Sequence, residues 1–332
     1  MPQINRQFVL ASRPQGAVTP DNFKLVETPL APLADGEIRV RNHFLSLDPY
    51  MRGRMNDSKS YAPPQPLNEV MIGGTVGEVV ESKNPKFAVG DKVVAMFGWQ
   101  EYGTSNGEGV QKVDDTHVPL SAYLGPVGMP GVTAWYGLNR ILAPQAGQTV
   151  VVSAASGAVG SVVGQLAKLA GARAVGIAGG ADKCRYVVET LGFDTCVDYK
   201  AGNLYQDLKA ATPGGVDGCF ENVGGEVLDA TIARMNPSGR IALCGYIAGY
   251  DGQPVPLRHP SLILTQRLLV QGFIVTEHLD VWPEALKQLG TLVAQKKLQY
   301  RETIAQGLDA APEAFIGLLK GKNFGKQLVK LI

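Results

Sequence analysis

The sequence predicts an α/β protein with a β-rich first domain and a second domain built on a doubly wound parallel sheet. Short β-type runs separated by turn residues fill the first third of the chain. From about residue 125, strand patterns alternate with helical patterns, which is the rhythm of parallel strands joined by helical crossovers. Six such strands are typical of a nucleotide-binding domain of the Rossmann type.

The β-rich region carries five strand candidates, parts of which alternate with a period of two. Turn residues such as Asp35-Gly36 and Val89-Gly90-Asp91 separate them. Residues 62–66 are too rich in proline for a helix or strand, so we expect a stiff surface loop there. The candidates are Phe8–Ala11, Phe23–Glu27, Glu37–Asn42, Thr75–Val80 and Lys92–Met96.

The second region carries six strand candidates with helical patterns between most of them, including Leu228–Met235. A longer helix, Trp282–Gln295, is expected after the sixth strand. The strand candidates are Val150–Ser153, Ala174–Ala178, Thr195–Asp198, Gly218–Glu221, Arg240–Cys244 and Leu269–Val275.

At 332 residues the chain exceeds the size of one comfortable core, so two domains are expected. The tail holds a short helix around Pro312–Leu319 and an apolar final strand, Gln327–Ile332. Because an apolar terminal strand needs a sheet to join, we place it back in the first domain. The expected domains are residues 1–125 with 301–332, and residues 126–300.

Composition bounds the possible partners. Lysine plus arginine (31) nearly balance aspartate plus glutamate (30), which gives no electrostatic reason to bind nucleic acid or an anionic membrane. Met1–Arg6 lacks the apolar core of a signal peptide, and no apolar run is long enough to span a bilayer. The four cysteines form no C-x-x-C pair and the four histidines show no ligand spacing, so we expect no metal. A cytoplasmic protein is expected.

The most informative segment is the turn that follows the first strand of the second region. A β-branched run, Val150–Val152, precedes two glycines three residues apart and then an amphipathic helical pattern. In such a turn Gly157 lets the backbone approach a pyrophosphate, and Gly160 lets the helix pack close to the strand. Ala155 departs from the usual G-x-G-x-x-G pattern, and an ordinary strand–helix turn remains the alternative. The residues expected to line the phosphate are Gly157, Ala158, Val159 and Gly160.

The end of the next strand predicts which dinucleotide binds. An NAD site usually carries Asp or Glu there, whereas this sequence has Gly179-Gly180 followed by Asp182 and Lys183. Without the carboxylate a 2′-phosphate is not repelled, and Lys183 supplies the complementary charge. We therefore predict NADPH as the cofactor. A solvated lysine at a helix start is the alternative, and Asp182 either competes for this lysine or caps the helix.

Motifs along the whole chain resemble one known family. Leu47–Arg52, Glu221–Gly225 and Gly317–Lys326 resemble the alkenal/one (double-bond) reductases of the medium-chain dehydrogenase/reductase superfamily, a group that uses no zinc. Met55–Pro64 and the tail are most similar to the branch of bacterial NADPH-dependent curcumin reductases. The resemblance implies a GroES-like β-rich catalytic domain beside a Rossmann domain, with NADPH as cofactor.

Zinc-dependent relatives in the same superfamily differ at recognisable places. They carry a cysteine and a Gly-His-Glu motif where this chain reads Leu45–Asp48 and Gly73–Thr75, and a four-cysteine loop that this chain lacks. Alcohol oxidation assisted by zinc therefore loses its chemical basis. Hydride transfer to a conjugated C=C bond survives, because the substrate's own carbonyl accepts the charge.

The resemblance implies reduction of an α,β-unsaturated ketone or aldehyde by hydride transfer to the β-carbon. The resulting enolate needs a hydrogen-bond donor, and neutral tyrosines suit that role. Tyr50 and Tyr250 are the candidates, each with a packing role as alternative. Some relatives place a substrate tyrosine where this chain has Thr265, and the nicotinamide ribose hydroxyl is another possible donor.

Further cofactor contacts carry over from the family by motif. Each of these residues also has an alternative reading as a turn or packing residue. The resemblance places them at the adenosine phosphate, at the strand ends and at the nicotinamide. The positions are Tyr199, Asn222, Cys244, Gly245, Tyr250, Phe273, Ile274, Val275 and Asn323.

Two further expectations concern partners. Loops Ser58–Glu69 and Tyr246–Leu262, rich in proline, glycine and tyrosine, are expected to wall the pocket of a small-molecule substrate. The sixth strand is a long apolar sheet edge, which predicts pairing in a homodimer. Alternative functions are an NADPH-dependent quinone oxidoreductase and a non-enzymatic nucleotide-binding protein.

Overall fold

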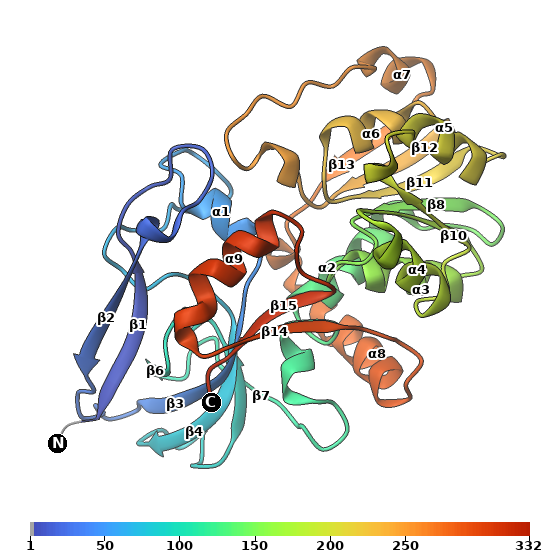
Figure 1. The fold of residues 1–332 in the computed structure, drawn as a ribbon. Coiled ribbons are helices and arrows are strands. Elements are labelled where there is room, and N and C mark those ends of the chain that lie inside the picture. Colours follow the sequence, from blue (N-terminus) through green and yellow to red (C-terminus); the bar gives the residue numbers. More distant parts are fainter. Residues whose placement is uncertain (1–2) are drawn as a thin grey trace. The chain divides into compact units, whose positions relative to one another are not determined.

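A computed structural model describes residues 3–332 of the chain (Figure 1). The described chain divides into two compact units. Unit 1 holds the N-terminal part to Leu124 together with Glu302–Asn323 and Gln327–Ile332, and unit 2 holds Gly125–Arg301 and Phe324–Lys326. Three residues of the tail therefore group with unit 2, although the residues on both sides group with unit 1.

Unit 1 is built on a seven-stranded sheet with the path β14-β15-β3-β4-β5-β7, to which β6 adds by pairing with β3. Strands β1 and β2 form a separate antiparallel pair in which Phe8 lies opposite Leu25. The strands are β1 (Ile4–Leu10), β2 (Phe23–Pro29), β3 (Ile38–Ser46), β4 (Thr75–Ser82), β5 (Lys92–Ala95), β6 (Tyr102–Ser105), β7 (Gln111–Lys112), β14 (Glu302–Gln306) and β15 (Lys326–Lys330). The helices are α1 (Tyr50–Arg54), α9 (Ala311–Leu319) and the 3₁₀ turns Pro20–Asn22, Leu120–Leu124 and Leu308–Ala310.

The C-terminal strand completes the sheet of unit 1. β15 pairs antiparallel with β3, with Leu328 opposite Ser46 and Val329 opposite Leu45. Leu328 and Val329 are fully buried, which is what an apolar terminal strand requires. The tail strand therefore joins a sheet, as its composition predicts.

An aromatic cluster forms the centre of the unit 1 core. The Trp99 ring stacks on Phe23 at 5.1 Å and meets Phe315 of α9 edge-on at 5.6 Å. Both Trp99 and Phe315 are fully buried. Because offset stacks and edge-on contacts add to apolar burial, these rings fix α9 against the N-terminal strands.

Unit 2 is a six-stranded parallel sheet in the order β10-β9-β8-β11-β12-β13, the strand order of a doubly wound nucleotide-binding fold. All five residues of the central β8 are buried, as expected for a strand covered on both faces. The strands are β8 (Thr149–Ser153), β9 (Arg173–Ala178), β10 (Thr195–Asp198), β11 (Val216–Glu221), β12 (Met235–Leu243) and β13 (Leu269–Gly272).

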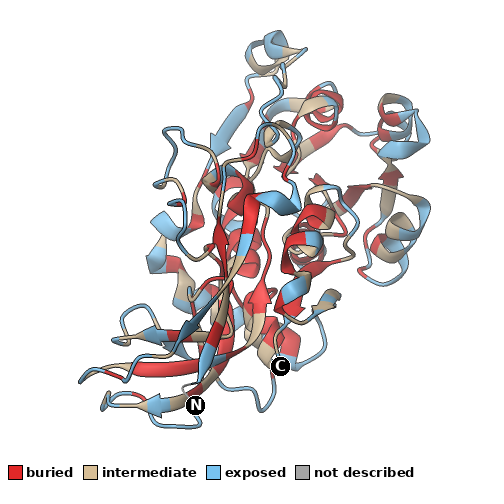
Figure 2. Cartoon of the chain, turned by 60° about the vertical axis from the view of Figure 1, so that its left-hand side comes forward, coloured by how far each residue is buried: buried red, intermediate tan, exposed pale blue. Residues whose placement is uncertain are grey.

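Helices connect the strands of unit 2. They are α2 (Met129–Tyr136), α3 (Gly160–Leu169), α4 (Ala181–Glu189), α5 (Leu204–Ala211), α6 (Gly225–Ile232), α7 (Pro260–Thr265) and α8 (Trp282–Ala294). Shorter turns are the π-helix Gly137–Leu142 and the 3₁₀ turns Tyr199–Ala201, Ile247–Gly249, Val275–Glu277 and Leu279–Val281. Figure 2 shows buried residues in both strands and helices, whereas the connecting loops are largely exposed.

The structure corrects two element boundaries and adds three strands. The sixth strand ends at Gly272 rather than Val275, because Phe273 turns into the core and a 3₁₀ turn follows. Helix α6 begins at Gly225 and ends at Ile232, since Met235 already pairs with Val216 as part of β12. Strands β6, β7 and β14 were absent from the sequence-based interpretation.

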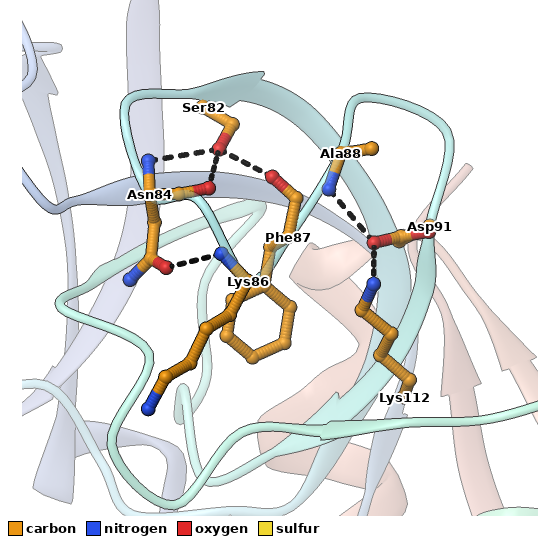
Figure 3. A network of polar contacts seen from close by, with 7 residues as sticks. All are labelled: Ser82, Asn84, Lys86, Phe87, Ala88, Asp91 and Lys112. Atoms are coloured by element: carbon orange, nitrogen blue, oxygen red, sulfur yellow. Dashed lines mark hydrogen bonds and ion pairs between the residues drawn. The ribbon is translucent and has the colours of Figure 1, made fainter.

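The turn between β4 and β5 is held by its own polar groups (Figure 3). The Ser82 hydroxyl donates to the Phe87 carbonyl at 2.6 Å. The Asp91 carboxylate accepts the Ala88 amide at 2.8 Å and the Lys112 ammonium at 2.6 Å. These contacts satisfy the turn locally and give it a structural role. Among residues 3–332, no helix is long and apolar enough to cross a membrane.

Candidate cofactor and active site

The backbone turns sharply between the end of β8 and the start of α3. Ala154 adopts φ 48°, and the Gly157 amide donates to the Ala154 carbonyl at 2.8 Å. A Cβ at Gly160 would lie 2.4 Å from that carbonyl oxygen, so the close approach of helix to strand requires glycine. Within the described chain no side chain caps α3, although the amides of Ser161, Val162 and Val163 already donate to the carbonyls of Gly157 and Val159. The amides at the very start of the helix are therefore the ones that face an anion in such a turn.

A buried polar cluster supports this turn from the neighbouring strand. The Ser153 hydroxyl donates to Glu221 Oε1 at 2.9 Å and accepts the Asn222 amide at 2.7 Å. The Asn222 side-chain amide donates to the Ser153 carbonyl at 2.9 Å. Asn222 is therefore fixed at the ends of β8 and β11, where an open α/β sheet binds its ligand.

Glu221 is fully buried at the end of β11. Burial raises the pKa of its carboxyl group, and hydrogen bonds from the amides of Gly224 and Val223 oppose that rise. Those amides lie 2.7 and 2.6 Å from Oε1. The carboxyl group thus holds both the turn 223–224 and the Ser153 hydroxyl by hydrogen bonds.

Two lysines meet at the ends of β9 and β10. The pKa of Lys183 is lowered, first by burial and then by the positive charge of Lys200. A Cβ at Gly179 would lie 2.8 Å from the Tyr199 ring and 3.0 Å from Lys200 Cε, so all three residues crowd together. A half-buried lysine beside an exposed one is a favourable place for a phosphate dianion.

The two aspartates beside this lysine pair have other partners. Asp182 pairs with Arg185 at 3.3 Å along α4. Asp198 accepts the Gly180 amide at 2.8 Å and the Lys200 amide at 2.9 Å. The backbone around Gly180 is therefore held in place by Asp198.

The tail segment Phe324–Lys326 packs on the same end of unit 2. The Phe324 ring lies under the Arg301 guanidinium at 4.2 Å, meets Tyr186 edge-on at 5.1 Å and lies 6.0 Å from Lys183 Nζ. The Gly325 amide donates to the Ser156 carbonyl at 3.0 Å, next to the bridge between Gly157 and Gly325. Asn323, the predicted cofactor contact, directly precedes this segment and is half-buried.

Strand ends of β11 and β12 bring three more predicted residues together. A Cβ at Gly245 would lie 3.1 Å from the Asn222 carbonyl oxygen and 3.6 Å from the Tyr250 hydroxyl oxygen. The amides of Cys244 and Gly245 both donate to the Glu221 carbonyl. Tyr250 follows a 3₁₀ turn and is half-buried. The hydroxyl of Tyr250 therefore lies beside Gly245, at the carboxyl end of the sheet.

The segment 273–275 is placed mainly by packing. Phe273 is buried against Tyr136 at 5.4 Å and Phe220 at 6.1 Å. Ile274 is half-buried. Val275 is buried, and its carbonyl accepts the Trp282 indole N–H at 3.2 Å. The side chains of Phe273 and Val275 thus serve the core.

Tyr50 is the predicted donor in unit 1. It opens helix α1 and packs against the aromatic core cluster. Its pKa is raised, chiefly by burial and then by the charge of Asp48. Asp48 is itself held by the Ser46 hydroxyl. Tyr50 therefore keeps its phenol proton at any ordinary assay pH.

Tyr61 is a neighbour of Tyr50 that the sequence did not single out. It lies in the loop predicted to wall the substrate pocket, is 53% exposed and acts electrostatically on Tyr50. Lys200, Arg301 and Phe324 were also missed as site residues, although Phe324 lay inside a quoted family motif.

Residues 3–332 contain no cluster of three or more His, Cys, Asp or Glu side chains placed to hold a metal ion.

The predicted residues of unit 2 fall into three groups. The phosphate turn comprises Gly157–Gly160, the lysine pair adjoins Tyr199, and Asn222, Gly245 and Tyr250 gather at the strand ends.

Two family models match the chain. One described as the N-terminal domain of oxidoreductase covers residues 6–113, and one described as zinc-binding dehydrogenase covers residues 158–291. The chain is 19% identical to an Escherichia coli quinone oxidoreductase solved with NADPH, with a TM-score of 0.78 over 99% of this chain and 100% of that one. That likeness shows a shared fold alone.

Nearer relatives share the whole chain. It is 47% identical to an NADPH-dependent curcumin reductase of Escherichia coli, over 99% of this chain and 97% of that protein. It is 43% identical to rat prostaglandin reductase 1, over 98% of each. The crystal structure of CurA from Vibrio vulnificus with NADPH matches with a TM-score of 0.94 and 46% identity, over 98% of this chain and 99% of that one. The chain therefore belongs to the alkenal/one (double-bond) reductase family of the medium-chain dehydrogenase/reductases.

Proposed function

We propose that this protein reduces the C=C bond of α,β-unsaturated ketones and aldehydes with NADPH. The observation that carries this conclusion is its full-length similarity, at 39–47% identity, to proteins named curcumin, prostaglandin and 2-alkenal reductases. Their names share one reaction type, although their substrates differ. The geometry of unit 2 agrees, since its phosphate turn and lysine pair fit a phosphorylated dinucleotide.

The residues present fit NADPH at both of its charged ends. The turn Gly157–Gly160 and the uncapped start of α3 would hold the pyrophosphate. Lys183 and Lys200, with Tyr199 beside them, would hold the 2′-phosphate, whose negative charge relieves the repulsion between the two ammonium groups. The cofactor, when bound, supplies the hydride that adds to the β-carbon of the substrate.

The remaining proposed contacts lie toward the nicotinamide. Asn222, Cys244 and Gly245 would border the nicotinamide at the ends of β11 and β12. Asn222 and Gly245 lie close together there, since a Cβ at Gly245 would be 3.1 Å from the Asn222 carbonyl oxygen. Backbone groups of 273–275 and the side chain of Asn323 complete the proposed set. These residues bind and orient the reacting groups, which is the protein's main contribution in cofactor chemistry.

Stabilisation of the enolate needs a donor to the substrate oxygen. We assign this role to Tyr50, with Tyr250 as second candidate, because each presents a neutral hydroxyl. Tyr50 suits it because burial raises its pKa and keeps its proton in place. One well-placed donor contributes on the order of 3 kcal/mol to the transition state. The substrate's carbonyl accepts the charge, so this route requires no metal.

A quinone oxidoreductase is the alternative function. The quinone oxidoreductases of this fold are much more distant, at about a fifth of residues identical, and support only the fold. The test is NADPH consumption by protein treated with a chelator, measured with a conjugated enone and separately with a benzoquinone. We expect consumption with the enone and a saturated carbonyl product. Consumption with the quinone alone would reverse the assignment, and consumption with neither would refute an enzymatic role.

We also propose a homodimer formed through β13. This strand ends the six-stranded sheet, all four of its residues are exposed, and Leu269 and Val270 present 46% and 37% of their surfaces. An apolar sheet edge of this kind favours pairing with a second copy.

A cytoplasmic location fits the four free thiols, since reducing compartments keep cysteines unpaired.

A further inference from the structure

Two cysteines of unit 2 lie against each other. Cys184 is in the first half of α4 and Cys196 is in β10, and their sulfur atoms are 2.8 Å apart. Both are free thiols and both are partly exposed. Such a distance exceeds a disulfide bond by less than 1 Å, so bond formation needs little movement of either element.

Solvent reaches this pair from one side. Cys196 lines a surface hollow of about 340 Å³ together with Thr195, Asp198, Asp207, Ala210 and Ala211. By contrast, Cys219 is fully buried in β11, with its sulfur 3.8 Å from the Glu221 carboxyl group. A small oxidant therefore reaches Cys196 through this hollow and Cys184 through its own partial exposure, and it is excluded from Cys219.

We propose that Cys184 and Cys196 are a dithiol site that hydrogen peroxide oxidises to an intramolecular disulfide. The Cys184 sulfur attacks one peroxide oxygen, the O–O bond breaks, and water leaves a sulfenic acid on Cys184. The Cys196 sulfur then attacks the Cys184 sulfur, forming the S–S bond and releasing a second water. Two thiols and one peroxide thus give one disulfide and two waters, and a small dithiol reductant reverses the oxidation.

The order of attack follows from the surroundings of each sulfur. The Cys196 thiol donates to the Cys184 sulfur, and this hydrogen bond is the main reason that the pKa of Cys184 is lowered. The same hydrogen bond, followed by burial, raises the pKa of Cys196. Cys184 also lies near the start of α4, where the helix dipole favours a thiolate. Cys184 is therefore the nucleophile toward peroxide, and Cys196 resolves the sulfenic acid.

The sequence allows a direct test, because Arg185 lies between the two cysteines. Trypsin releases Cys184-Arg185 and Tyr186–Lys200 as separate peptides unless a disulfide joins them. Full-length protein is reduced, desalted, treated with stoichiometric hydrogen peroxide, alkylated and digested without reductant. We expect the joined peptides in the mass spectrum, an intact mass lowered by two hydrogens before alkylation, and loss of both signals after reduction.

Variants separate this site from general thiol oxidation. Cys184→Ser and Cys196→Ser should each abolish the joined peptides, whereas Cys219→Ser should retain them. Oxidation of Cys184 to sulfinic acid without joined peptides, disulfides between two chains on a non-reducing gel, or four thiols still alkylated after peroxide would each overturn the proposal. The readout is a mass, so it does not depend on the proposed enone reductase activity.

Discussion

The hydroxyl of Ser153 lies 2.9 Å from the carboxyl group of Glu221, and both residues are fully buried where neighbouring strands β8 and β11 end. The same hydroxyl accepts the Asn222 amide, so one buried carboxyl group fixes the end of both strands. The Glu221 carboxyl group also accepts the amides of Val223 and Gly224. Glu221 is a positioning residue, and its protonation state has consequences for stability.

Glu221→Gln is expected to make stability less dependent on pH. Burial raises the pKa of Glu221 above its ordinary 4.5, so the native state holds this proton more tightly than the unfolded chain. The stabilisation is fully present below pH 4.5 and is lost as pH rises through the raised pKa. Gln keeps the acceptor oxygen without a titrating proton. The measurement is the unfolding midpoint of both proteins between about pH 5 and pH 8.

Glu221→Ala is the companion variant, because it removes the oxygen that accepts these hydrogen bonds as well as the titrating proton. It leaves the amides of Val223 and Gly224 buried without their partner, which costs roughly 3 kcal/mol of unfolding free energy. If the wild type and the Gln variant changed in parallel with pH, Glu221 would not be the group responsible.

Lys183→Ala is expected to shift the cofactor preference. Loss of a charged contact to the 2′-phosphate raises KM for NADPH by about tenfold to a hundredfold and leaves KM for NADH nearly unchanged. Lys200→Ala acts in the same direction. Because burial and Lys200 lower the pKa of Lys183, the advantage of NADPH should also shrink as pH rises through that lowered pKa.

Steady-state kinetics with both cofactors check this prediction. Lys209→Ala, an exposed lysine on α5, is the control and should change neither KM. An equal rise of both KM values in the Lys183 variant would assign the lysine to general stability.

Gly160→Ala is expected to destabilise the phosphate turn. The added methyl would lie 2.4 Å from the Ala154 carbonyl oxygen, which is backbone and has little room to yield. Overpacking of this kind costs about 1–3 kcal/mol and moves α3 away from β8. Thermal melting with and without NADPH is the measurement, and Gly214→Ala, where nothing lies within 4 Å, is the control. If the Gly160 variant had the same melting temperature and the same affinity for NADPH as the control, the close approach of α3 to β8 would not be required for cofactor binding.

Tyr50→Phe is expected to lower kcat by roughly tenfold to a hundredfold, with little change in KM for NADPH. The reason is loss of a neutral donor to the enolate oxygen. Tyr250→Phe should lower kcat as well if its hydroxyl beside Gly245 serves the substrate. Tyr123→Phe, which loses only a hydrogen bond to the Asp114 carbonyl, is the control. Full turnover in both the Tyr50 and Tyr250 variants would exclude tyrosine from the reaction.

Val270→Lys combined with Leu269→Lys is expected to convert the proposed dimer to a monomer. Two charges on an edge strand oppose pairing with an identical copy. Light scattering after size exclusion measures the mass of both proteins. A wild-type monomer at micromolar concentration would contradict the proposed dimer.

The parallel sheet of unit 2 could be predicted because its strands are short, β-branched and separated by helical periodicity. The strands that escaped prediction lack that signal. Both residues of β7 are exposed, and β14 is exposed or half-buried throughout, so no apolar pattern marks either strand. The sixth strand was overextended because Phe273–Val275 remain apolar after the strand ends at Gly272.

The candidate site shows the same division. Gly160 and Lys183 lie next to strand ends in the sequence, so local patterns predict them. Arg301 and Phe324 meet at 4.2 Å across a stretch of chain that includes β14 and α9, and local spacing carries no signal for such a contact. The apolar pattern predicted the final strand of the tail, but only the family resemblance drew attention to Asn323 as a cofactor contact.

The pairing of β15 with β3 has a consequence for biosynthesis. Ribosomes deliver β3 early and β15 only after every strand of the parallel sheet has been made. During that interval the Ile38–Arg41 part of β3 can pair with β6, whereas the Phe44–Ser46 part still lacks β15. This part of β3 is therefore an unpaired strand edge while the rest of the chain is being synthesised. A chain that ends before β15 cannot complete the sheet of unit 1.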